Sequence, residues 1–220
     1  MKPLLTAFAL ASLIYSNCAA QPDSMVVKKR YPIKSCRIVF QFFNGPQRGT
    51  KTVTFDDWGN KVKEEVVTMT DTATMRKWMA SLQDSLNQPD ARAFMQNLRL
   101  MAVQHNLKIT VGSQSYGIDL DHHIGAKSPV YLFGGSFEGN MKQMGFAVVR
   151  TDTFLGKPCK VWEHPGSFRF WIWKNFYVVK KEMIQSLAAG MRMEEYATEI
   201  DESYPIKPGE FLIPDNIRFR

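Results

Sequence analysis

The fold prediction rests mainly on one stretch of sequence, Cys159–Met183, which reads CKVWEHPGSFRFWIWKNFYVVKKEM. Successive side chains of an extended strand point to opposite faces. One face of this segment would therefore carry Phe168, Phe170 and Ile172, and the other Trp171 and Trp173. Lys174–Asn175 can turn the chain, and residues 176–181 can return beside the first strand. The segment predicts three antiparallel strands that are apolar on both faces, which need protein cover on both sides or a ligand on one.

The flanking sequence predicts a mostly β protein of the α+β class. Strands rich in β-branched and aromatic residues are expected at 37–42, 50–56, 61–69, 98–104, 107–111 and 116–120. A turn is expected at His105–Asn106, although residues 98–104 could instead end a helix. Residues 191–200 fit either a strand or a helix.

Two helical segments are expected to cover the aromatic meander. Hydrophobic residues recur every three or four positions within an insert at 71–97, beginning with Met75, Trp78, Met79 and Leu82. Asp71 or Thr70 can cap this helix. A second, short helix is expected at 136–144, with Phe137, Met141 and Met144 facing inward.

The composition is that of one ordinary globular domain. The chain has 220 residues, of which 45% are hydrophobic and 22% charged, so it can bury a sizeable core. Its formal net charge is +7. Lysine and arginine are scattered along the chain, so no nucleic-acid partner is expected, and the charge predicts solubility and weak attraction to anionic surfaces.

The N-terminus is typical of an exported protein. Lys2 precedes the apolar stretch 4–15, which is too short to span a bilayer, and small residues follow at 18–20. Two outcomes stay open. Cleavage after Ala20 would remove residues 1–20, or Cys18 would become the lipid-bearing first residue after a signal of residues 1–17. Residues 21–34 are predicted to be a flexible lead-in, and the protein is expected in the periplasm or attached to the outer membrane.

Two cysteines remain after the signal segment, Cys36 and Cys159. In an oxidising compartment they could form a disulfide. Free cysteine is also among the most buried residue types, so they could equally be two core residues. Both alternatives stay open from the sequence.

No sequence motif indicates a reaction. The chain has no glycine-rich phosphate loop, no nucleophile elbow, no HExxH and no paired CxxC motif. His122 and His123 would point to opposite faces of a strand, so they predict a polar turn rather than a metal site. Asp56–Asp57 beside Trp58 predicts a hairpin turn. We therefore expect no enzyme, no cofactor and no metal.

Five short motifs, in chain order, resemble those of a family of uncharacterised exported lipoproteins of Gram-negative bacteria. They are TFDDWG at 54–59, YGIDL at 116–120, MGF at 144–146, LGKPCKVW at 155–162 and FLIP at 211–214. The resemblance spans most of the mature chain. It implies a fold similar to that of lipoprotein carriers such as LolA: a curved antiparallel sheet forming a half-open barrel, with helices packed on its concave face. Residues 35–220 would then form a single domain.

Those carriers hold acyl chains against aromatic and methionine side chains. By this resemblance, the lining of a hydrophobic-ligand site would include Met75, Trp78, Met79, Phe168, Phe170, Trp171 and Trp173. The alternative is that these residues form an ordinary core between sheet and helix. The expected function is a non-enzymatic envelope protein that binds a lipid or other hydrophobic ligand. A second hypothesis is an accessory component of an envelope complex, which binds a protein through a sheet edge or a basic face.

Overall fold

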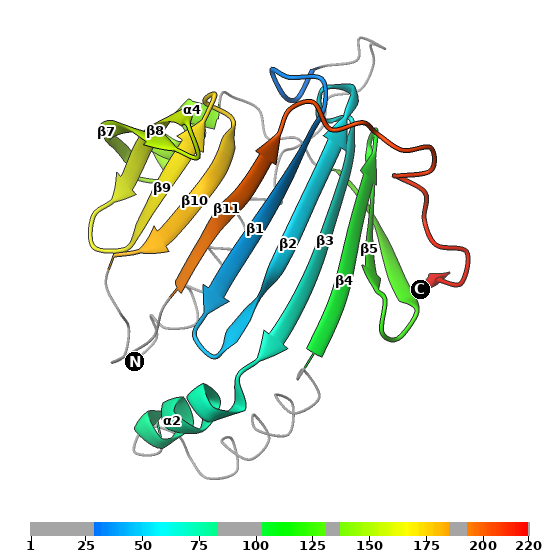
Figure 1. Cartoon of the computed structure of the whole chain (residues 1–220), viewed down its shortest axis with the longest axis horizontal. Helices are drawn as coiled ribbons and strands as arrows, with labels where there is room; N and C mark the ends of the chain where they lie inside the picture. Colours follow the sequence, from blue (N-terminus) through cyan, green and yellow to red (C-terminus); the bar gives the residue numbers. More distant parts are fainter. Residues whose placement is uncertain (1–28, 83–102, 131–136, 185–192, 220) are drawn as a thin grey trace.

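A computed structural model describes residues 29–82, 103–130, 137–184 and 193–219. Within these residues one sheet of twelve strands dominates the fold (Figure 1). The strands are β1 (Cys36–Asn44), β2 (Gln47–Asp56), β3 (Lys61–Thr70), β4 (Val103–Val111), β5 (Gln114–Asp119), β6 (Ile124–Pro129), β7 (Ala147–Phe154), β8 (Lys157–His164), β9 (Phe168–Trp173), β10 (Tyr177–Met183), β11 (Met193–Asp201) and β12 (Arg218–Phe219). The helices are α2 (Thr72–Leu82) and α4 (Phe137–Gln143).

The order of strands in the sheet places an early strand, β1, next to a late one, β11. Across the sheet the strands run β12-β6-β5-β4-β3-β2-β1-β11-β10-β9-β8-β7. All neighbours are antiparallel except β12 and β6. Pairing of β1 with β11 therefore places two consecutive series of strands side by side in one sheet. The mostly β class and the antiparallel sheet are confirmed.

The sheet is curved and unclosed, and aromatic contacts identify its concave face. Phe55 on β2 and Tyr177 on β10 are separated by two strands, yet their ring centroids lie 6.4 Å apart. In a flat sheet three strand spacings would separate them by about 14 Å. The face that carries Phe55 and Tyr177 is therefore concave, and the opposite face is convex.

Residues 29–34, predicted to be part of a flexible lead-in, are bound to the sheet. The backbone amides of Arg30 and Tyr31 donate hydrogen bonds to the carbonyl of Trp58, and the Trp58 amide donates one to Lys34. The Tyr31 ring then packs edge-on against Phe55 on the concave side, with ring centroids 4.7 Å apart. These contacts correct the prediction for this part of the lead-in.

The aromatic meander forms the three predicted strands, β8, β9 and β10, and both of its faces are covered. Trp171 and Trp173 join the concave core cluster, together with buried side chains of β1 and β2. Phe168 and Phe170 lie in a second cluster, which Met141 of α4 covers on the convex side. The short helix was therefore placed correctly as cover. Its last predicted inward residue, Met144, is instead exposed.

The first part of the helix predicted within the insert at 71–97 forms as α2, and the Asp71 carboxylate caps it by accepting hydrogen bonds from the amides of Ala73 and Thr74. Figure 1 shows α2 beyond the ends of β3 and β4. Packing of helices on the concave face, implied by the resemblance, is not confirmed. Residues 83–97 of the predicted insert lie outside the described residues.

One further prediction is wrong, and one segment that the sequence left ambiguous is now assigned. No turn forms at His105–Asn106, because β4 runs unbroken from Val103 to Val111 and pairs with β3 throughout. The ambiguous segment at 191–200 is a strand, β11, in its described part. The C-terminal segment then crosses the convex face, where Phe211, Ile213 and Ile217 pack on side chains of β4 and β5.

Candidate functional site

Those residues expected to line one hydrophobic site whose side chains the structure describes do not come together. Trp171 and Trp173 are on the concave side, whereas Phe168 and Phe170 are on the convex side. Met75 is buried in α2 and belongs to neither cluster. Trp78 and Met79 also lie in α2, but their side chains are outside the described structure. A single pocket lined by this set is therefore not formed by its described members.

The two tryptophans are used in packing. Trp173 is 1% exposed and Trp171 is 5% exposed. The indole Nε1 of Trp171 donates a hydrogen bond of 2.9 Å to the carboxylate of Asp152, and this bond is the main cause that lowers the pKa of Asp152. Their apolar surfaces face protein, so the alternative of an ordinary core describes them.

The two phenylalanines on the convex side, Phe168 and Phe170, are also packed against other side chains. Phe168 and Phe170 stack with centroids 6.1 Å apart, and Phe146 lies 5.0 Å from Phe170. Met141 closes this cluster and is 1% exposed. An acyl chain could enter here only by displacing α4.

Cys36 and Cys159 are free thiols, and both are buried in the concave core cluster. Burial raises the pKa of Cys36 to about 12 and that of Cys159 to about 11. Both are therefore neutral at physiological pH and weakly nucleophilic. Of the two alternatives left open by the sequence, the structure has core residues rather than a disulfide.

Each histidine is held by a nearby polar partner. The ring of His164 contacts Ser167 at 2.7 Å, His122 contacts Asp119 at 2.8 Å, and His123 contacts Asn216 at 2.9 Å. His105 contacts Glu65 at 2.8 Å. No group of three or more His, Cys, Asp or Glu side chains among the described residues could hold a metal ion.

Charged groups cross the middle of the concave face. Glu195 on β11 forms ion pairs with Lys51 on β2 and, at 3.1 Å, with Lys181 on β10. Burial would raise the pKa of Glu195, but the two ammonium groups outweigh it and hold the pKa below the ordinary value. This ionic bridge spans four neighbouring strands of the curved sheet.

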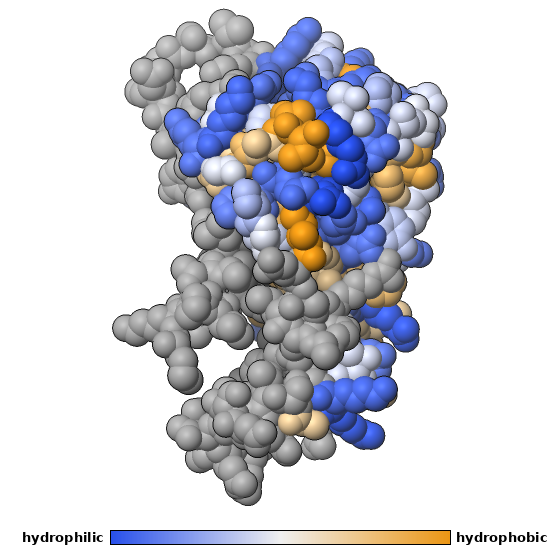
Figure 2. Space-filling model, turned by 90° about the vertical axis from the view of Figure 1, so that its left-hand side faces the viewer, coloured by the Kyte–Doolittle hydropathy of each residue, from blue (hydrophilic) through white to orange (hydrophobic). Residues whose placement is uncertain are grey.

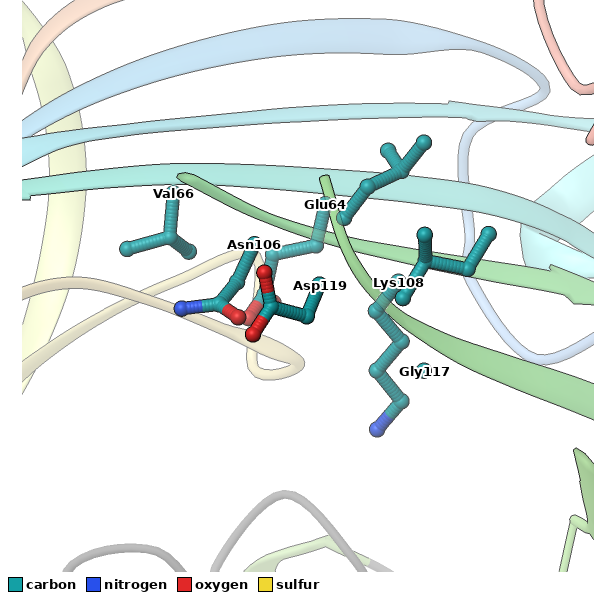
Figure 3. Close-up of a pocket in the computed structure, with 8 residues that line it drawn as sticks. Glu64, Val66, Asn106, Lys108, Gly117 and Asp119 are labelled. Atoms are coloured by element: carbon teal, nitrogen blue, oxygen red, sulfur yellow. The ribbon is translucent and has the colours of Figure 1, made fainter. Parts of the chain in front are cut away.

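An open hollow on the concave face is lined largely by polar and charged residues, although much of its exposed surface is apolar, and Figure 3 shows the side chains that line it. We call this surface on β3, β4 and β5 the polar wall. Its lining comprises Glu64, Val66, Asn106, Lys108, Gly117 and Asp119, together with the backbone of Leu107 and Ile118. Strand pairing sets Glu64 opposite Lys108 and Asn106 opposite Asp119, so hydrogen-bonding groups of both charges face the same space.

The polar wall is open and shallow. Asn106, Lys108 and Gly117 line it, and a Cβ atom built on Gly117 would meet no atom within 4 Å. The hollow measures about 260 Å³, below the range of about 300–1,000 Å³ that is usual for small-molecule sites. Partial burial would raise the pKa of Asp119, but hydrogen bonds from His122 outweigh it and lower that pKa. Asp119 is therefore ionised at neutral pH.

A sheet edge was expected as a possible partner surface, and β7 forms one edge of this sheet. Figure 2 views the β7 side of the molecule, where hydrophobic residues lie in small groups among hydrophilic ones. Val148 and Val149 are 43% and 51% exposed. An irregularity in the ladder between Val148 and Arg150 and the charges of Arg150 and Asp152 interrupt this edge. Such features discourage strand addition, which makes the polar wall the stronger candidate.

Sequence reasoning missed the polar wall. The signal is present in Asn106 and Lys108, which alternate with apolar Leu107 and Ile109. The expected turn at His105–Asn106 concealed this alternation. Even a correct prediction of strand β4 would not have shown that the face carrying Asn106 and Lys108 is concave.

Comparison with known proteins supports the fold alone. No family model matches the chain, and no curated protein matches it. Among solved structures, an uncharacterized conserved protein from Thermus thermophilus is similar with a TM-score of 0.50 and 7% identity. The match covers 86% of this chain and 91% of that one. Within the described residues, no helix is long and apolar enough to cross a membrane.

Proposed function

We propose that this chain is an exported, non-enzymatic protein of the cell envelope that binds a protein partner through the polar wall. The observation that carries the proposal is the division of the concave face. Its aromatic part is filled by buried side chains, and its accessible part offers polar groups in a shallow hollow. A shallow polar surface suits a macromolecular contact better than it suits an acyl chain.

A binding role, rather than a catalytic one, is supported by the state of the titratable groups. The described histidines are held in local hydrogen bonds, and the cysteines have raised pKa values. A general base or nucleophile needs a pKa suited to its task and access to a substrate. The two cysteines offer neither, because both are buried and their thiol pKa values are raised.

Changes of charge and bulk on the polar wall test the proposal. Lys108→Glu and Gly117→Arg should each abolish capture of the partner from cross-linked envelopes. Lys127→Glu is the matched control, because Lys127 is an exposed lysine on β6 whose side chain faces the convex side, over Tyr116. Equal capture by Lys108→Glu and Lys127→Glu would contradict a partner site on the polar wall.

Binding of a hydrophobic ligand is the second candidate function. The curvature of the unclosed sheet favours it, because a half-open barrel is the shape that the lipoprotein carriers use. Mass spectrometry of a solvent extract of the purified protein would decide between the two. A stoichiometric lipid in that extract would favour the ligand-binding role, whereas a lipid-free protein would favour the protein partner.

A further inference from the structure

A second hollow lies on the convex face, opposite the polar wall. It is formed between strands β1–β3 and the C-terminal residues 204–210, and we call it the convex groove. Its volume is about 390 Å³, within the usual range for small-molecule sites. Thr50, Thr52 and Thr54, at alternate positions of β2, form its floor.

The threonine floor has hydrogen-bonding capacity that the protein does not use. Within the described residues, the hydroxyls of Thr50, Thr52 and Thr54 make no hydrogen bond to another protein group. Thr54 is only 2% exposed. Each hydroxyl is both a donor and an acceptor. The floor therefore presents a row of unused hydroxyls to a molecule in the groove.

Among the described residues, the charges around the groove leave one cation without an ion pair. Arg37 forms an ion pair of 3.2 Å with Glu199, and its guanidinium lies over the Tyr204 ring at 5.5 Å. Lys63 is paired with Glu210 at 3.2 Å and with Glu65 at 3.7 Å. The ammonium group of Lys207, by contrast, forms no ion pair with any described residue. The groove therefore fits a ligand that carries hydroxyl groups and one acidic group.

We propose that the convex groove binds an acidic monosaccharide. The sugar hydroxyls exchange hydrogen bonds with Thr50, Thr52 and Thr54, and its carboxylate or phosphate pairs with Lys207. Tyr204 supplies an aromatic wall, which Arg37 holds in place. This site is separate from the polar wall, so it does not depend on the proposed protein partner.

Calorimetric titration of the purified full-length chain tests the proposal with three probes: glucuronate, glucose 6-phosphate and glucose. Glucuronate and glucose 6-phosphate distinguish a carboxylate from a phosphate ligand, and one of them should bind at least tenfold more tightly than glucose. Lys207→Gln should remove that preference. Lys108→Gln, on the polar wall, is the matched control and should leave it unchanged.

Thr54→Val tests the floor, because valine has nearly the shape of threonine and lacks only the hydroxyl. We expect affinity for the acidic sugar to fall about fivefold, while the thermal midpoint stays unchanged because no protein hydrogen bond is lost. Thr52→Val repeats the test if Thr54→Val fails to fold. Absence of binding by both acidic probes, or unchanged affinity in both Lys207→Gln and the threonine variants, would overturn the proposal.

Discussion

At the scale of a single residue, Gly59 allows the Asp57–Trp58 turn to pack closely against Tyr31. It follows the Asp57–Trp58 turn with a φ of +84°, a backbone conformation that favours glycine. A Cβ atom at this position would lie 2.5 Å from Cδ2 of Tyr31. The glycine of the TFDDWG motif thus makes room for the tyrosine that seals the concave core.

Gly59→Ala should therefore destabilise the fold by about 2–4 kcal/mol, from the combined cost of backbone strain and the collision with Tyr31. Urea unfolding would measure the change. Gly112→Ala is a matched control, since Gly112 has a φ of +56° but open space around its Cβ position. It should cost only the backbone part, about 1–2 kcal/mol. Equal losses in the two variants would show that the contact with Tyr31 contributes nothing.

Glu195 forms ion pairs with two lysines, Lys51, which is buried, and Lys181, which is half-buried. Glu195→Gln would remove the charged partner that Lys51 and Lys181 share, and we expect a loss of about 3–5 kcal/mol in unfolding free energy. Glu199→Gln, which removes an exposed pair with Arg37, should cost less than about 1 kcal/mol. Similar losses would contradict a structural role for the ionic bridge.

The same residue predicts a pH dependence. The pKa of Glu195 is lower in the folded protein than its ordinary value of about 4.3 in the unfolded chain. Its contribution to stability is therefore complete above about pH 4.3 and is lost as pH falls through the folded pKa. Unfolding curves between neutral and acid pH should show this loss in the parent protein. Glu195→Gln should show a smaller loss over the same interval.

At the scale of elements, the C-terminal segment acts as cover for the convex face. Phe211, Ile213 and Ile217 pack on Leu107, Ile109 and Ile118. The strands β4 and β5 would otherwise expose this apolar face while their other face forms the polar wall. The segment is therefore part of the fold, although it contains little regular structure.

Ile213→Ala should destabilise the protein by about 1–3 kcal/mol, because it removes a partly buried side chain from this contact. The adjacent Leu212 is 74% exposed, so Leu212→Ala should change stability by less than about 0.5 kcal/mol. Thermal unfolding of both variants measures the difference. A larger effect from Leu212→Ala would mean that the segment packs in another way.

At the scale of the whole molecule, export and lipidation at Cys18 stay predictions from the sequence. If Cys18 carries a lipid, Cys18→Ala should move the protein from the membrane fraction to the soluble fraction. Cell fractionation and mass spectrometry of the N-terminus would measure this. A mature chain that begins at Gln21 and an unchanged distribution would show that Cys18 is not acylated.

Several local features of this protein could be predicted from its amino-acid sequence. The alternation of Phe168 and Phe170 with Trp171 and Trp173 predicted strands that are apolar on both faces and need cover on both sides or a ligand on one. The short helix at 136–144 was expected to be part of that cover. These predictions succeeded because strand and helix periods are set by neighbouring residues. The prediction that Asp71 can cap α2 is confirmed for the same reason, because a helix cap depends on neighbouring residues.

Which surface of the sheet is accessible depends on contacts between distant parts of the chain. Pairing of β1 with β11 and the curvature of the sheet bring Phe55 and Tyr177 together, fill the aromatic part of the concave face and leave its polar part open. The convex groove likewise joins β2 to residues of the C-terminal segment about 150 positions away in sequence. Curvature and long-range pairing depend on contacts between distant residues, which the periodicity of a single chain segment does not encode.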